Sequence, residues 1–182
     1  MLILQHDKIL KQRLQESIDL KTNLLNNTVI LNTVEAIVKD IVTCYKNDGK
    51  VLWAGNGGSA ADSQHLSAEL SGRFYYDRPP LFSEALHVNT SYTTAVANDY
   101  SYDIIYSRLT QAMGRKGDVL IGLSTSGNSV NVIKALEVAN QIGMVTVAFT
   151  GVFVEGMLMR YLDTSFILPP VSPVKATVTI PS

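Results

Sequence analysis

The run Val51-Leu52-Trp53-Ala54-Gly55-Asn56-Gly57-Gly58-Ser59 decides the fold. Its first four residues are apolar and stop at a glycine-rich turn, which is typical of a buried strand followed by a tight turn. The pattern recurs, because residues 119–123 form a second apolar run that ends in Ser124-Thr125-Ser126-Gly127-Asn128-Ser129. Apolar residues at helical spacing follow the second turn, namely Val132, Ile133, Leu136 and Ala139. Each run therefore predicts a strand, a turn and a helix.

Neighbouring segments extend this alternation. Residues 145–149 predict a third strand, which ends at Thr150 and Gly151, and residues 85–88 predict a short strand between the two glycine-containing turns. A further helix is expected from apolar residues at i, i+4 and i+8, which are Ile105, Leu109 and Met113. Alternating strands and helices predict an α/β fold, a three-layer sandwich in which helices cover both faces of a mostly parallel sheet.

The first fifty residues have a different period and predict two helices. Leu10, Leu14, Ile18 and Leu25 fall close to one helical face. The second helix is expected from Ile30, Val34, Ile37, Val38, Ile41 and Tyr45. Both helices would carry a wide apolar stripe, so we expect them to take part in an oligomer.

The length of 182 residues predicts one domain. We divide it into a helical extension (1–48), an α/β core (49–168) and an atypical tail (169–182). Residues 166–168 are a candidate last strand, but three prolines follow, at positions 169, 170 and 173. Residues 174, 176, 178 and 180 then alternate like an apolar strand, which should be paired or covered.

Composition excludes several classes of protein. An apolar content of 46% against 17% charged residues indicates a globular chain and not a disordered one. The net charge of −1 provides no field to attract nucleic acid or an anionic membrane, and we find no signal sequence or membrane-spanning run. Cys44 is the only cysteine, so an intrachain disulfide is excluded and a cytoplasmic location is expected.

The two turns are the strongest candidates for a ligand site. Because ligands of open parallel sheets bind at the carboxyl ends of strands, both turns should lie on one rim. The helix expected to start at Ser59 offers free N–H groups to an anion, although Ser59 with Asp62 also matches a helix-capping box. Four hydroxyls in the second turn, of Ser124, Thr125, Ser126 and Ser129, exceed the need of one cap and favour a phosphate monoester. Neither turn matches a dinucleotide or nucleotide motif, so no nucleotide cofactor is expected.

Proton-transfer candidates follow the first turn. His65 and Glu69 are four residues apart on one helical face, which suits either acid–base catalysis or an exposed structural pair. The pair alone is a weak zinc site, because zinc needs three or four ligands. Arg73 either contacts an anion or complements the helix dipole, and the pair Asn98-Asp99 either binds sugar hydroxyls or caps the next helix. The tyrosines at positions 75, 76, 100, 102 and 106 favour core or interface positions over a stacking platform.

Four motifs occur in order along the chain: Gly55–Ser59, the segment Gln64-His65-Leu66-Ser67-Ala68-Glu69-Leu70-Ser71-Gly72-Arg73-Phe74, the pair Asn98-Asp99, and Gly117-Asp118-Val119-Leu120 leading to the Ser124–Ser129 turn. Together they resemble the sugar isomerase (SIS) domain of the phosphoheptose isomerases, and the similarity spans residues 8–151. The resemblance implies a flavodoxin-like five-stranded parallel sheet and a homotetramer with active sites between subunits. It also implies the conversion of sedoheptulose 7-phosphate to D-glycero-D-manno-heptose 7-phosphate, the first step of bacterial heptose biosynthesis for lipopolysaccharide or capsule.

Residue roles are also implied by the resemblance. Glu69 would move a proton between C1 and C2 through an enediol, and His65 would line the site and join Glu69 as a zinc ligand. The expected substrate-binding residues are Asn56, Gly57, Gly58, Ser59, Arg73, Asn98, Asp99, Ser124, Thr125, Ser126 and Ser129.

The resemblance stops near Gly151. The family continues with a glycine-rich loop, a strand and a helix that presents a Gln and a His, whereas the last Gln here is Gln141 and the last His is His87. A truncated or misregistered chain, a divergent enzyme and a non-catalytic relative would each account for this, and we favour the first. The main alternative function is that of SIS proteins that bind the replication initiator, but these lack the catalytic pair that His65 and Glu69 form here. A sugar-phosphate sensor would need a DNA-binding module, for which 182 residues leave no room.

Overall fold

The structure is a computed structural model that describes residues 2–151 and 164–167 of the chain. The predicted tail (169–182), with its alternating residues 174–180, lies outside the described residues. The chain order of elements is α1 (Leu2–Leu25), α2 (Thr28–Lys46), β1 (Val51–Gly55), α3 (Gly58–Ser71), β2 (Ser83–Ala85), α4 (Thr90–Asp99), the 3₁₀ turn η1 (Tyr102–Ile104), α5 (Ile105–Met113), β3 (Val119–Ser124), α6 (Val130–Ile142), β4 (Val145–Thr150) and β5 (Thr164–Ile167).

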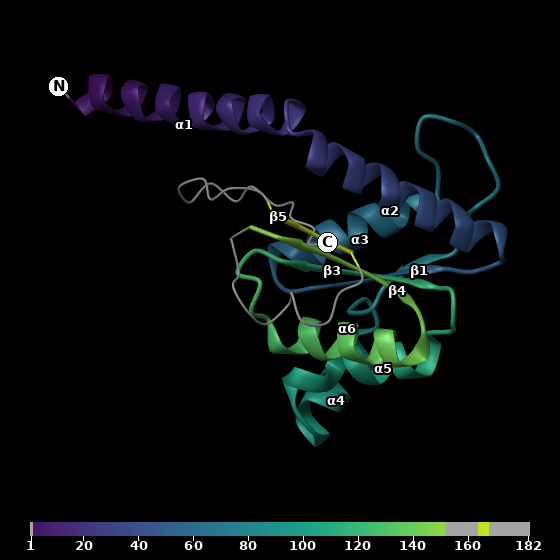
Figure 1. Ribbon diagram of the computed structural model, residues 1–182. Helices are drawn as coiled ribbons and strands as arrows, with labels where there is room; N and C mark the ends of the chain where they lie inside the picture. The colour runs from purple at the N-terminus through teal and green to yellow at the C-terminus, as the bar shows by residue number, and fades with distance from the viewer. Residues whose placement is uncertain (1, 152–163, 168–182) are drawn as a thin grey trace.

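A parallel sheet lies at the centre, with the strand order β2-β1-β3-β4-β5. Helices α2 and α3 cover one face, α5 and α6 cover the other, and α4 lies beyond α5 and α6 (Figure 1). The α/β class, the parallel sheet and the two N-terminal helices are therefore confirmed. Strands β1 and β3 are buried at every residue, as expected for strands covered on both faces.

Alternating residues of the central strands supply two separate cores. Leu52 and Leu120 face α5 and α6, where they join Tyr106 and Leu136. Val51, Trp53, Val119 and Ile121 face α2 and α3, where they join Ile37 and Leu70. Because side chains alternate across a strand, adjacent apolar residues fill both layers. The sheet is thus fixed from both sides, and its rim positions the loops.

One local prediction is wrong, and one helix was not predicted. The short strand is β2 at Ser83–Ala85 and not residues 85–88, because the pairing with β1 begins at Ser83 opposite Val51. Helix α4 was not predicted, because its sequence is rich in threonine, a poor helix former. Its N-terminus is stabilised by Asn89, whose side chain accepts a hydrogen bond from the Tyr92 N–H at 3.0 Å.

The amino ends of the strands are joined by a buried ion pair. Lys50 Nζ lies 2.5 Å from Asp118 Oδ2, with 14% and 4% of the two side chains exposed. Asp118 also accepts hydrogen bonds from the backbone N–H groups of Lys50 (3.0 Å) and Arg115 (2.7 Å). One carboxylate therefore connects the starts of β1 and β3, on the rim opposite the two glycine-containing turns.

Helix α1 extends away from the sheet and meets α2 only near their junction (Figure 1). The predicted apolar stripe is real and lies in solvent, since Leu10, Leu14, Ile18 and Leu25 are each more than half exposed. No helix in the described part of the chain is long and apolar enough to cross a membrane.

Candidate functional site

The two predicted ligand turns lie side by side. Strands β1 and β3 are paired, with Gly55 opposite Leu123, so the turns after Gly55 and Ser124 leave the same edge of the sheet. Strand order also reverses between β1 and β3, because β2 lies outside β1 while β4 lies outside β3. Ligands of open α/β sheets bind at such a switch point. The prediction that both turns share one rim is confirmed.

The first turn is built by glycine. Gly57 has φ of +56°, which favours glycine, and it is the N-cap of α3. A Cβ atom on Gly55 would lie 2.6 Å from the backbone oxygen of Ser59, so this position must also lack a side chain. Ser59 is the second residue of α3, and the N-cap is Gly57, which has no side chain to cap the helix. The capping-box interpretation of Ser59 is therefore wrong, because the N-cap is Gly57, two residues earlier.

The second turn holds its hydroxyls close together. Ser124 Oγ and Ser129 Oγ lie 2.9 Å apart, and the Asn128 N–H donates to Ser126 Oγ at 3.2 Å. Ser129 is the N-cap of α6 but makes no side-chain cap bond. Thr125 is exposed on the turn, and its carbonyl accepts a hydrogen bond from the Gly151 N–H. The turn thus presents hydroxyls and the start of a helix at one point, as anion sites require.

An unpredicted amide pair joins the two turns. Asn56 Nδ2 donates to Asn131 Oδ1, and Asn131 Nδ2 donates to Asn56 Oδ1, both at 2.9 Å. The Tyr102 hydroxyl also donates to Asn56 Oδ1, at 3.0 Å. The side chain of Asn56 connects β1 to the start of α6, and its predicted role in substrate binding stays a prediction. No motif in the sequence marked Asn131, which occupies an ordinary helical position.

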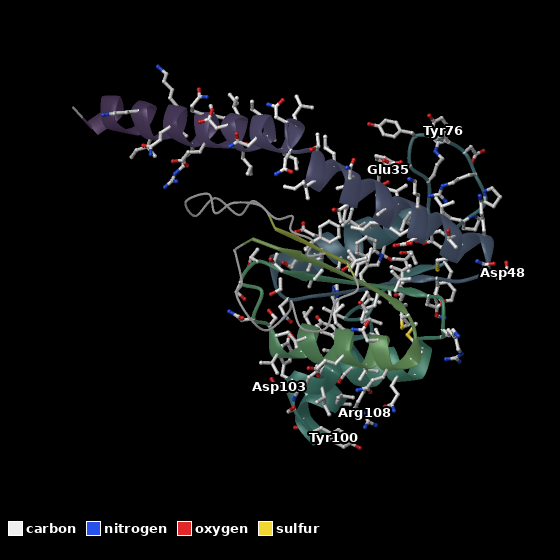
Figure 2. All side chains as sticks on the ribbon, viewed as in Figure 1. Glu35, Asp48, Tyr76, Tyr100, Asp103 and Arg108 are labelled. Carbon is white, nitrogen blue, oxygen red and sulfur yellow. The ribbon has the colours of Figure 1, made fainter. Side chains whose placement is uncertain are left out.

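Tyr106 contacts the same turn from the core between the sheet and α6. Its hydroxyl donates a hydrogen bond to the backbone oxygen of Gly55. Burial raises the pKa of Tyr106, and the neighbouring Tyr102 raises it further, so the hydroxyl remains a neutral donor. The expectation that this tyrosine lies in the core is confirmed. By contrast Tyr100 is exposed beside Arg108, whose guanidinium carbon lies 4.4 Å from the ring centroid (Figure 2).

His65 and Glu69 form a pair on α3. His65 Nε2 lies 3.4 Å from Glu69 Oε1, and the two side chains are 75% and 32% exposed. They share a helical face, as predicted, while Ser59, Ser63 and Ser67 face the sheet. Ten residues separate Ser59 from Glu69, which is about 15 Å along the helix axis and about 80° around it. Side chains lean toward the helix N-terminus, which shortens this separation.

The remaining predicted residues lie at the ends of α4 and α3. Asn98 and Asp99 end α4, where Asn98 Nδ2 donates to Asp99 Oδ1 at 3.0 Å. They do not cap the next helical segment, since Ser101 precedes η1 and Ile104 precedes α5. Arg73 is exposed beyond the C-terminus of α3.

Arg78, which the sequence did not mark, completes the end of α3. Its guanidinium donates to the carbonyl oxygens of Glu69 (2.9 Å) and Leu70 (2.8 Å). Unpaired carbonyls at a helix C-terminus need such partners. Arg78 also ties the end of α3 to the following loop, which bears the exposed Tyr76 (Figure 2). Arg78, and not Arg73, thus has the helix-end role.

A metal centre needs more ligands than the pair provides. Among the described residues, no group of three or more His, Cys, Asp or Glu side chains is placed to hold a metal ion. Zinc in proteins takes three or four such ligands, and His65 with Glu69 supplies two. The described residues therefore do not by themselves fit a zinc site.

Comparisons with known proteins agree with this geometry. The model of the SIS domain family matches residues 21–151. A phosphoheptose isomerase of Mycobacterium tuberculosis is 48% identical over 148 residues, which cover 81% of this chain and 75% of that protein. Another, from Aneurinibacillus thermoaerophilus, is 44% identical over 160 residues, or 88% of this chain and 80% of that protein. The solved structure of a phosphoheptose isomerase from Neisseria gonorrhoeae superposes with a TM-score of 0.80 at 39% identity, covering 92% of this chain and 88% of that one.

Proposed function

Since the chain belongs to the SIS-domain family of phosphoheptose isomerases, we propose that it isomerises sedoheptulose 7-phosphate with Glu69 as the base. Similarity to the curated relatives assigns the reaction, a ketose–aldose isomerisation. The roles of individual residues are our inference.

The observation that carries the proposal is the meeting of two helix starts at the β1/β3 switch point. Helices α3 and α6 begin at adjacent turns, and the first N–H groups of a helix have no partner within it. Their dipoles favour an anion at that point. We assign this position to the substrate phosphate, with Ser59, Ser124, Thr125, Ser126 and Ser129 around it. Gly57 and Gly58 let the substrate approach the backbone.

The phosphate fixes which part of the sugar reaches Glu69. Helix α3 runs from the phosphate position past His65 to Glu69. An extended seven-carbon sugar anchored by its 7-phosphate would place C1 and C2 along this helix. Holding the reacting atoms near the base supplies much of the catalysis, because it removes the entropy cost of a chance encounter.

The chemistry needs one group that accepts and returns a carbon-bound proton. Glu69 would remove a proton from C1 of the ketose, a second proton would pass from the C1 hydroxyl to the C2 oxygen through the enediol, and Glu69 would return its proton to C2, which leaves a C1 aldehyde and a C2 hydroxyl. His65, 3.4 Å away, orients the carboxylate. Arg73, Asn98 and Asp99 would contact the sugar hydroxyls. A zinc ion bound by His65 and Glu69 would need ligands from beyond the described residues, so no step is routed through it.

We also propose that the chain assembles into a homotetramer. The stripe formed by Leu10, Leu14, Ile18 and Leu25 leaves more apolar surface in water than an isolated domain normally exposes. We expect the same stripe on a second copy to pack against it, because a two-fold symmetric interface pairs the same surface of both subunits.

Replacing Glu69 by glutamine tests the assignment. Glu69→Gln keeps the shape of the side chain but removes its basicity, so aldose formation should fall at least about a hundredfold, the usual scale for loss of a general base. Binding of inorganic phosphate should stay within about twofold of the unmutated chain. Glu137→Gln, the same change on α6 away from the turns, is the matched control. A loss confined to KM would make Glu69 a binding residue instead.

A further inference from the structure

Asn131 combines features that a surface residue of a helix start would not need. It lies in the first turn of α6, yet only 3% of it is exposed. Its Oδ1 accepts two hydrogen bonds at 2.9 Å, from Asn56 Nδ2 and from the Val132 N–H. Its Nδ2 donates to Asn56 Oδ1. The oxygen is thus fully used within the protein, and the amide is held in one orientation.

The partner of Asn131 lies at the centre of the first turn. Asn56 follows the last residue of β1 and precedes the N-cap of α3. Two other hydrogen bonds reach this turn, from η1 and α5: the hydroxyl of Tyr102 donates to Asn56, and that of Tyr106 donates to Gly55. Of these contacts, the pair with Asn131 is the one that connects the turn to α6. It therefore links the starts of α3 and α6 directly, beside the pairing of β1 with β3.

We propose that Asn131 is a positioning residue that holds both helix starts at the separation needed to bind one phosphate. This inference rests on the proposed function for the nature of the ligand. Asn131 acts through Asn56, and its side chain makes no contact with the ligand. Two helix starts can share one anion only if their N–H groups converge, and the amide pair enforces that convergence.

Phosphate affinity is the direct readout, because it requires no proton transfer. Asn131→Leu keeps the approximate shape and deletes the amide. The loss of three hydrogen bonds, two with Asn56 and one from the Val132 N–H, should weaken the binding of inorganic phosphate, measured by calorimetry, by about tenfold or more. Gln141→Leu removes an exposed amide from the same helix and should leave the affinity within about twofold. Equal phosphate affinity in Asn131→Leu and the unmutated chain would overturn the proposal.

A double-mutant cycle separates positioning from general support of the fold. If Asn131 acts through Asn56, then Asn56→Leu with Asn131→Leu should bind phosphate as weakly as Asn56→Leu alone, within about twofold. If the double variant instead loses phosphate affinity by the product of the two single-variant factors, the two residues act independently, which contradicts the proposal.

Asn131→Asp provides a test that survives if the leucine variant does not fold. While ionised, the aspartate accepts hydrogen bonds but cannot donate to Asn56, whereas its protonated form can. The ratio of its phosphate Kd to that of the unmutated chain should therefore fall as the pH is lowered from 8 to 5. Asn128→Asp places a similar charge on the exposed part of the turn, outside the pair. The same fall in Asn128→Asp would attribute the effect to charge alone and overturn the inference.

Failure of the proposed function gives a different pattern. A chain that binds phosphate through Asn131 but forms no aldose would contradict the isomerase assignment and leave the positioning role intact. A chain that binds no phosphate at millimolar concentration would contradict both.

Discussion

Replacing Gly55 by alanine should separate a backbone clash from an ordinary packing change. The added Cβ would lie 2.6 Å from the oxygen and 2.8 Å from the carbonyl carbon of Ser59, and both are backbone atoms of the first turn of α3. Relief requires the helix start itself to move. Forced overpacking of this kind costs about 2–3 kcal/mol. For a chain of this size, that cost lowers Tm by roughly 4–12 °C.

Gly122→Ala is the matched control on the neighbouring strand. There the new Cβ would meet Val132 Cγ1 at 2.7 Å and Leu136 Cδ1 at 3.2 Å, which are side-chain ends that can shift. We expect a cost of about 1 kcal/mol, offset in part by the lower entropy of the unfolded alanine chain.

Urea unfolding, followed by the fluorescence of Trp53 in β1, gives both free energies of unfolding. Protein concentration must be equal, because assembly changes apparent stability. Gly55→Ala should also lose phosphate affinity, whereas Gly122→Ala should keep it. Equal destabilisation of the two variants, with phosphate affinity retained in both, would refute the reasoning.

Three further outcomes follow from the same structure. Asp118→Ala leaves the Lys50 ammonium buried without its partner and should lower the free energy of unfolding by about 3–5 kcal/mol, whereas Glu35→Ala in an exposed pair should leave the urea midpoint unchanged. Light scattering at micromolar concentration should give the mass of a tetramer, and a clean monomer would contradict the role of the apolar stripe on α1. Burial lowers the pKa of His87, so the folded state favours the neutral imidazole. The contribution of His87 to the free energy of unfolding is therefore fully present above pH 6.5, the ordinary pKa, and is lost as the pH falls through the folded-state pKa. Stability should therefore decline more in acid for the unmutated chain than for His87→Leu, and parallel pH profiles would refute this.

The fold was predictable because its signals are local. An apolar run that ends in glycine or serine and is followed by a helical period occurs twice, and parallel pairing then places both turns on one rim. Helix α4 escaped prediction because asparagine capping and tertiary contacts outweigh its threonine content. The start of β2 depends on pairing with Val51 opposite Ser83, which no local pattern reports.

The site was predictable in its residue types and less so in their roles. Serines at a turn indicate a phosphate site, but whether Ser59 caps the helix or lies inside it depends on the positive φ of Gly57. The amide pair of Asn56 could not be predicted, since nothing in the sequence relates it to Asn131, 75 residues away. Long-range hydrogen bonds of this kind appear only when the chain is folded. The alternating strand predicted for residues 174–180 lies outside the described residues and stays a prediction.

The central claim is tested most directly by incubating the purified chain with sedoheptulose 7-phosphate and following the aldose product. We expect saturable turnover that inorganic phosphate inhibits competitively and that Glu69→Gln lowers at least about a hundredfold. Folded chain that binds phosphate at the two turns but forms no aldose above the Glu69→Gln background would contradict it.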